Sequence, residues 1–200
     1  MSDKYKRLSP FFNAILQRLE PQEPRSIAVA TPELRPGLLE TPDRAAKAWE
    51  FWTSGYDIDV PGLFKAFEDG ADNVNEMVTV ANIPFYSHCE HHMAAIFGRV
   101  TVGYIPNGKI VGLSKISRVV DAFARRLQVQ ERMTTQIADA IMQHLEPRGV
   151  GVRVVARHMC MESRGICQQG HHTTTTALRG VFNEGTVRGE FLASCNGATP

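Results

Sequence analysis

The sequence contains no apolar run of about 18 residues, the length at which a segment becomes a candidate membrane-spanning helix, so we expect no membrane span. It also has almost no net charge, because 22 Lys and Arg residues stand against 21 Asp and Glu residues, which leaves a formal charge of +1. Such a chain offers no overall electrostatic attraction to nucleic acid or to an anionic membrane. Any anion-binding site must therefore be local.

Cysteine is scarce as well, with four residues at positions 89, 160, 167 and 195. The first ten residues, MSDKYKRLSP, lack the apolar stretch of a signal peptide. Without a secretion signal, four cysteines are more typical of metal ligands or free thiols than of a disulfide framework. We therefore expect a cytoplasmic protein.

Groups that bind metals and carry protons are concentrated in one short stretch, Ser87-His88-Cys89-Glu90-His91-His92. Cys89 and His92 are three positions apart, so one tight turn can direct both at the same ion. A second cluster, His158-Met159-Cys160, follows later in the chain. Catalytic zinc usually takes three protein ligands and keeps a fourth position open. We predict that Cys89, His92 and Cys160 meet in the fold and hold Zn²⁺.

These clusters could instead have a purely structural role. The cysteines could be small buried apolar residues, with the histidines in loops. Against this, burying Glu90, His91 and His92 without partners would be costly. A closed structural zinc site could instead take Cys167 or His171 as a fourth ligand. The open site is favoured because two histidines would remain beside the metal, where hydrolysis needs proton carriers with pKa values near neutrality.

The spacing of apolar residues predicts an α+β domain with two helices packed on one face of an antiparallel sheet, in the order β-β-α-α-β-β. Alternate residues of a strand lie on one face, so His158 and Cys160 should leave the sheet on the same side. We expect an N-terminal helical segment over residues 1–75, a catalytic domain over 76–195 and a disordered tail over 196–200. The predicted elements are helices over 8–19, 41–55, 62–68, 115–126, 130–145 and 187–195, and strands over 96–104, 150–160 and 173–182. A further strand is predicted to begin near 77–80 and to break at the His-rich stretch.

Four motifs then occur in an order that resembles one enzyme family. They are Cys-Glu-His-His (89–92), Gly-Leu-Ser-Lys-Ile-Ser-Arg (112–118), Gln-Val-Gln-Glu-Arg (128–132) and His-Met-Cys-Met-Glu-Ser-Arg-Gly (158–165). From about Leu38 to Phe191 the chain resembles GTP cyclohydrolase I, the zinc enzyme that converts GTP to 7,8-dihydroneopterin triphosphate and formate. The resemblance implies a tunnelling fold, in which subunit sheets join into a barrel. It also implies a homo-oligomer, typically a decamer, with active sites between subunits.

The resemblance assigns the chemistry to particular residues. The zinc ligands of the family match Cys89, His92 and Cys160, and the zinc would activate the water that attacks C8 of guanine. The histidine that passes a proton to N7 as the imidazole ring opens matches His158. The second catalytic histidine, near the ribose, matches His91.

Substrate contacts are implied in the same way. Glu131 matches the carboxylate that grips guanine, with Gln130 beside it, and a carboxylate can accept from both N1–H and N2–H₂ of guanine. Ser114 matches a residue close to the ribose and is grouped with the catalytic residues. No Walker-type glycine loop is present, so side-chain cations would have to bind the triphosphate. Any one of these cations alone could be part of a solvated helix face. The matching positions are Lys115, Arg118, Arg164 and Arg44.

Two alternatives remain: another tunnelling-fold enzyme acting on pterins or deazapurines, and a non-catalytic zinc-binding relative. A structural zinc site needs neither a pair of free histidines nor Glu131, which argues against the second. Cys167, His171 and His172 depart from the pattern of the family, and we expect them to lie in a solvated loop. Nothing in the sequence chooses among folate, biopterin and deazaguanine synthesis as the pathway served.

Overall fold

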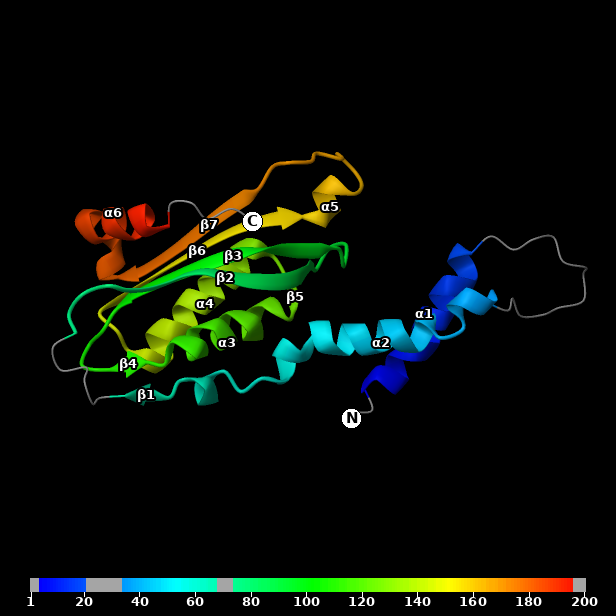
Figure 1. Cartoon of the computed structure of the whole chain (residues 1–200), viewed down its shortest axis with the longest axis horizontal. Coiled ribbons are helices and arrows are strands. Elements are labelled where there is room, and N and C mark those ends of the chain that lie inside the picture. The colour runs from blue at the N-terminus through cyan, green and yellow to red at the C-terminus, as the bar shows by residue number, and fades with distance from the viewer. Residues whose placement is uncertain (1–3, 21–33, 68–73, 196–200) are drawn as a thin grey trace, which may run out of the picture. The chain divides into compact units, whose positions relative to one another are not determined.

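The computed structural model describes residues 4–20, 34–67 and 74–195 (Figure 1). The chain divides into two compact units, one ending at Thr53 and the other beginning at Ser54. The expected boundary between residues 75 and 76 stays a prediction, and the expected disordered tail over 196–200 lies outside the described residues. Among the residues described, no helix combines the length and the apolar character needed to cross a membrane.

The N-terminal unit is a pair of packed helices, α1 (Lys4–Leu19) and α2 (Thr41–Trp52), with the short helix η1 (Pro36–Leu38) between them in sequence. Ser9 on α1 donates a hydrogen bond to Asp43 Oδ1 on α2 at 2.5 Å. Helix α2 begins at Thr41 as predicted, with Glu40 at the cap position and with Pro42 and Asp43 in its first turn.

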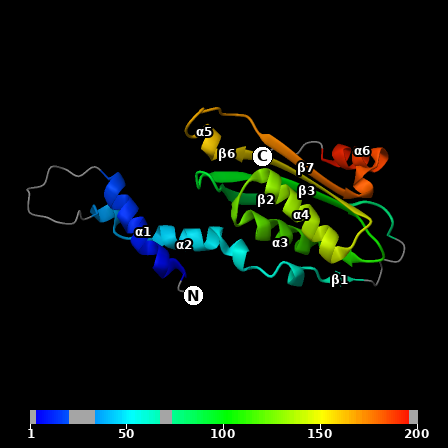
Figure 2. The same cartoon turned by 180° about the vertical axis from the view of Figure 1, so that it is seen from behind.

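The second unit is built on a five-stranded sheet in the order β5-β2-β3-β6-β7. Strands β2, β3, β6 and β7 are antiparallel neighbours, and β5 pairs with β2 in parallel. Helices α3 and α4 cover one face of this sheet (Figures 1 and 2). The predicted α+β tunnelling-type arrangement is confirmed. The elements are β2 (Val78–Cys89), β3 (Ala95–Ile105), α3 (Leu113–Ala124), β5 (Leu127–Gln128), α4 (Gln130–Leu145), β6 (Gly149–His158) and β7 (Thr173–Gly180).

Smaller elements complete this unit. A two-stranded ribbon pairs β1 (Ala66–Phe67) with β4 (Ile110–Val111). The short helix expected over 62–68 is instead η3 (Pro61–Leu63) followed by β1, whereas the expected closing helix is present as α6. The remaining short helices are η2 (Ser54–Asp57), α5 (Met159–Glu162), η4 (Val181–Asn183) and α6 (Gly185–Ser194).

Two strand ends differ from the prediction, and both matter for the site. Strand β2 does not break at the start of the His-rich stretch but continues into it as far as Cys89, after a register shift at which Asn82 takes a positive φ of 58°. Strand β6 ends at His158 rather than at 160, because its partner there, Ile96, is only the second residue of β3. The chain then turns into α5, so Cys160 lies on a helical turn and not on the strand.

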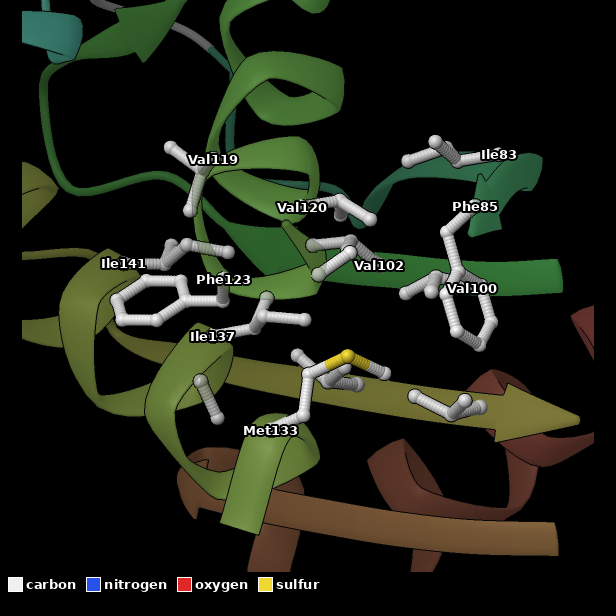
Figure 3. Packing of buried hydrophobic residues seen from close by; sticks show 14 of the residues in the cluster. Ile83, Phe85, Val100, Val102, Val119, Val120, Phe123, Met133, Ile137 and Ile141 are labelled. Carbon is white, nitrogen blue, oxygen red and sulfur yellow. The ribbon is translucent and has the colours of Figure 1, made fainter. Parts of the chain in front are cut away.

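The core lies between the sheet and the two helices (Figure 3). Residues that recur at steps of three and four on α3 and α4 form one apolar face on each helix. These faces meet the alternate residues of β2 and β3 that point to the same side. The labelled core residues are Ile83, Phe85, Val100, Val102, Val119, Val120, Phe123, Met133, Ile137 and Ile141, each less than a tenth exposed.

Strands β3 and β6 approach so closely at Gly98 that no side chain fits. A Cβ atom there would lie 2.0 Å from the carbonyl oxygen of Val155 and 2.7 Å from Cα of Ala156. We expect Gly98→Ala to lower the free energy of unfolding by about 1–3 kcal/mol, because backbone atoms must move apart. A urea titration measures the change. Gly189→Ala on α6 is the control, since a Cβ there meets nothing within 4 Å. Equal stability of the Gly98 variant and the unmodified chain would contradict this packing.

Candidate metal centre

Both predicted clusters come together at one end of the sheet, where β2 and β6 end and β3 begins. After Cys89 the chain reverses in a tight turn over residues 90–93. The backbone N–H of Cys89 donates to the Ala94 carbonyl at 2.8 Å, and that of Met93 donates to the Cys89 carbonyl at 2.7 Å. Met93 closes the turn with a positive φ of 56°. The predicted turn is therefore present, anchored by the last residue of a long strand.

Cys89, His92 and Cys160 form a group whose ligand atoms all lie within 4.8 Å of one another. The Cys89 sulfur is 3.8 Å from Nδ1 of His92. Zinc bonds of about 2.3 Å to sulfur and about 2.0–2.1 Å to nitrogen put tetrahedral ligand atoms roughly 3.5–3.8 Å apart. Two thiols and an imidazole at this spacing could hold a metal ion, and the donor set fits zinc.

Only one of the two adjacent histidines belongs to this group, namely His92. Nδ1 of His91 is also 3.8 Å from the Cys89 sulfur, yet only His92 also lies close to Cys160. Across the ranges 4–20, 34–67 and 74–195, neither Cys167 nor His171 belongs to the group. The structure therefore offers three candidate ligands, as the open-site prediction requires, and gives no support to a closed site with either residue as fourth ligand.

The thiols of this group are buried, with Cys89 6% and Cys160 9% exposed. Burial raises the pKa of the Cys160 thiol, and the neighbouring Cys89 raises it further. At the edge of the group, Nη1 of Arg164 lies 3.4 Å from both Nε2 of His92 and the carbonyl oxygen of Cys160. Crowded thiols become thiolates when a metal ion displaces their protons, so the arrangement suits a bound cation.

A cavity of about 220 Å³ opens beside this group. Seven of the predicted site residues line it: Cys89, His91, His92, Gln130, Glu131, His158 and Cys160. The other lining residues were not predicted, because they are neutral and carry no chemical signature, although several lie inside the four family motifs. They are Ile96, Gln128, Val129, Met161 and Thr173.

His158 occupies the end of β6 and is partly buried. Its Nε2 atom lies 2.7 Å from Oε1 of Gln130, the first residue of α4. Burial lowers the pKa of His158, and the opposing influence of the Glu131 carboxylate is smaller. Burial therefore favours the neutral form of the ring, which can accept a proton.

Two ion pairs that sequence reasoning did not find hold the ligand-bearing turns. Glu90 pairs with Arg132 of α4, whose Nε donates to Oε1 of Gln128 at 3.2 Å. The Arg132 hydrogen bond is the main reason that the pKa of Glu90 is lowered. In α5, Glu162 accepts from Nε of Arg157 on β6 at 2.9 Å. Each turn that carries ligands is thus tied to a neighbouring element.

We expect Glu90→Gln to weaken zinc binding by roughly tenfold, because groups that orient metal ligands typically contribute a factor of about 10–100 to metal affinity. Competition with a chromophoric chelator measures the affinity. Asp139→Asn is the matched control, since it removes a carboxylate paired with Arg179 at 2.7 Å away from the metal ligands. If both variants bound zinc like the unmodified chain, the Glu90–Arg132 pair would have no role in holding the turn.

Three predicted residues lie away from this cavity within the single chain. Ser114, Lys115 and Arg118 occupy the first turns of α3, which begins after β4 and ends near β5. A helix of 12 residues is about 18 Å long, so its first turn is far from the end that faces the metal group. Their roles remain predictions.

The other outlying predictions concern Arg44 and the loop after α5. Arg44 lies on α2 of the N-terminal unit, where it pairs with Glu40. Cys167, His171 and His172 lie in a segment without helix or strand, as expected, and Cys167 takes a positive φ of 53°. The proposed contact of Arg44 with phosphate stays a prediction.

Comparison with known proteins gives one consistent result. Residues 26–196 match the family described as GTP cyclohydrolase I. A protein named GTP cyclohydrolase 1 from Janthinobacterium sp. (strain Marseille) is 59% identical over 159 residues, which cover 79% of this chain and 80% of that protein. Proteins of the same name from Nitrosospira multiformis and Campylobacter curvus are 52% and 54% identical, over 80% and 81% of this chain and 84% and 85% of theirs.

A solved structure is also similar, described as archaeosine synthase QueF-Like in the apo form. Its TM-score is 0.42 at 19% sequence identity, with 52% of this chain and 93% of that chain covered. A similarity of this size carries no argument about function.

Proposed function

The chain belongs to the GTP cyclohydrolase I family, and from this premise we propose that it hydrolyses GTP at C8, releases formate and rearranges the remainder to 7,8-dihydroneopterin triphosphate. The observation that carries the proposal is one cavity lined by a Cys-His-Cys group and by two further histidines, His91 and His158. A structural metal site would need neither of these histidines. Their presence favours an enzyme over a zinc-binding relative without activity.

We propose that Zn²⁺ is the metal, held by Cys89, His92 and Cys160. When bound, zinc supplies a Lewis acid that makes water acidic enough to serve as a nucleophile near neutral pH. The spacing and softness of the donors support this choice over magnesium or calcium, which prefer oxygen ligands. The pairs Glu90–Arg132 and Arg157–Glu162 keep the two ligand-bearing turns in place.

His158 is the proposed acid and base for ring opening. It lines the cavity beside the ligands, and its lowered pKa keeps it neutral near pH 7, where it can accept a proton and then return one to N7 of guanine. His91 is largely exposed, with its Nε2 3.8 Å from Oε1 of Glu90. This exposure suits a contact with the ribose, which lies beyond the base.

Glu131 is the proposed recognition group for guanine. It is the second residue of α4, and it is an exposed residue that lines the cavity. A carboxylate accepts hydrogen bonds from both N1–H and N2–H₂ of guanine, whereas adenine presents no such pair of donors. Glu131 would therefore select GTP over ATP.

We expect Glu131→Gln to weaken GTP binding by about 10- to 100-fold, because an amide donor would then face the donors of guanine and charge-assisted hydrogen bonds would be lost. Equilibrium binding of GTP and ATP to the zinc-loaded protein measures the preference. Glu190→Gln, at an exposed position on α6, serves as the control. An unchanged preference for GTP in the Glu131 variant would refute the guanine assignment.

The triphosphate and the oligomer are proposed together. A cavity of about 220 Å³ lies below the roughly 300–1,000 Å³ of typical ligand sites, so it suits the base while the phosphates extend outward. Nη1 of Arg164 lies 3.4 Å from Nε2 of His92, which lines the cavity. Because Ser114, Lys115 and Arg118 lie at the other end of α3, we propose that a neighbouring subunit supplies these contacts. We propose a homodecamer, as the family resemblance implies, and the expected cytoplasmic location stays a prediction.

The products of GTP test the activity. Zinc-loaded protein should convert GTP to formate and to a compound that becomes a fluorescent pterin after oxidation. Formate without a pterin would mean that the chain stops at the ring-opened intermediate. Absence of both from zinc-loaded protein would remove the proposed function.

A further inference from the structure

The side chain of Gln130 is almost completely buried, at 1% exposed, although it borders the cavity. Its Nε2 atom lies 3.1 Å from the carbonyl oxygen of Thr173 and 3.3 Å from that of Val154. It also lies 3.0 Å from Oγ1 of Thr175. The amide therefore reaches from α4 to both β6 and β7, and its hydrogens are used within the chain.

These partners determine which way the amide faces. Carbonyl oxygens only accept hydrogen bonds, so the atom directed at Val154 and Thr173 must be the NH₂ group. The hydroxyl groups of two threonines agree with this orientation. Thr134 donates its hydrogen to the backbone carbonyl oxygen of Gln130 at 2.7 Å, so its oxygen must accept from Thr175, 2.6 Å away. Thr175 is then left to accept from the Gln130 amide. With the NH₂ group committed to the strands, Oε1 is the atom that faces His158.

The orientation of the amide in turn determines the tautomer of His158. Oε1 of Gln130 can only accept a hydrogen bond, and it lies 2.7 Å from Nε2 of His158. A bare Nε2 would put two lone pairs opposite each other at this distance, so Nε2 carries the hydrogen. The hydrogen bond made by one ring nitrogen thus decides the state of the other.

We propose that Gln130 is a positioning residue that holds His158 in the tautomer protonated at Nε2, so that Nδ1 is the atom that exchanges a proton with the substrate. This inference rests on the proposed function, in which His158 serves as acid and base. The neutral ring accepts a proton at Nδ1, and the resulting imidazolium returns that proton from the same atom. Nε2–H stays bonded to Gln130 throughout. Gln130 acts through His158, in place of a direct contact with guanine.

Nitrogen NMR reads the tautomer directly. Magic-angle-spinning spectra of the zinc-loaded full chain, labelled with ¹⁵N-histidine, distinguish a protonated ring nitrogen from a bare one, and the signal lost in His158→Asn assigns His158. At a pH where the ring is neutral, we expect Nε2 to carry the hydrogen. Hydrogen on Nδ1 in the unmodified chain would overturn the proposal. Gln130→Met should give a mixture of tautomers, and a purely Nε2-protonated ring in that variant would also overturn it.

Steady-state kinetics separate positioning from substrate binding. For Gln130→Met we expect kcat for formate release to fall about 10- to 100-fold, with zinc content and KM for GTP nearly unchanged. Tyr104→Phe is the matched control, because it removes a buried hydrogen bond to the Val111 N–H at the other end of the sheet. Its kcat should be unaffected. A raised KM with an unchanged kcat in the Gln130 variant would show a substrate contact instead.

The two readouts keep the inference apart from the proposed function. The tautomer of His158 is measured without turnover, so it stands or falls even if the chain releases no formate. If formate is released and Nδ1 carries the hydrogen, only the inference fails. If Gln130→Met does not fold, the spectrum of the unmodified chain still decides the tautomer.

Discussion

Replacing His158 with Ala is expected to lower kcat for formate release by about 10²- to 10⁴-fold, the contribution typical of a positioned acid or base. His158 lies in the same cavity as the three proposed metal ligands but is not among them. The variant should therefore keep its zinc while it loses hydrolysis at C8. Single-turnover release of formate, with zinc measured on the same sample, tests both parts.

A second histidine provides the control for that experiment. His144 lies in the last turn of α4, at the opposite end of the helix from Gln130, and its ring contacts Phe64 at a centroid distance of 5.3 Å. His144→Ala should leave kcat unchanged. Full activity of the His158 variant would contradict the acid–base assignment. Loss of zinc from it would mean that His158 supports the metal group as well.

Cys160→Ala is expected to abolish zinc binding and, with it, nearly all formate release. Only two ligands would remain, and one of the two buried thiols that a metal converts to thiolate would be missing. Elemental analysis of the purified variant should find less than about a tenth of the zinc of the unmodified chain, because a catalytic zinc site normally has three protein ligands.

Cys167→Ala is the matched control, and it also tests the closed structural site. Cys167 is exposed and lies outside the Cys-His-Cys group. Its replacement should leave both zinc content and activity unchanged. Loss of zinc from this variant would show that the loop supplies a fourth ligand, and would contradict a site with an open position.

The sequence predicted most of the fold because the two helices and the strands carry strong periodic patterns. The bounds of α4, 130–145, agree with the prediction, since its apolar residues recur at steps of four and its end is marked by Pro147 and Gly149. The predicted end of β6 was wrong. Alternation describes residues within a strand but not where the partner strand stops. Here β3 begins at Ala95, and its pairing with β6 ends at Ile96 and His158.

The site was predictable where residue type dictates chemistry and not where packing decides it. Clustered cysteine and histidine side chains have few roles, and metal binding is the main one. The structure brings Cys89, His92 and Cys160 together as expected. Glu90 and Gln130 could pair with many groups, so their roles depended on tertiary contacts with Arg132 and His158. The amide orientation of Gln130, in particular, follows from carbonyl groups on two distant strands.

The central claim is that this metal group is where C8 of GTP is removed. It is tested most directly by GTP labelled with ¹³C at C8, given to chelator-stripped protein and to the same protein reloaded with zinc. We predict labelled formate in proportion to the zinc bound, and none above background from stripped protein or from Cys160→Ala. Labelled formate at an equal rate from stripped and reloaded protein would contradict the claim.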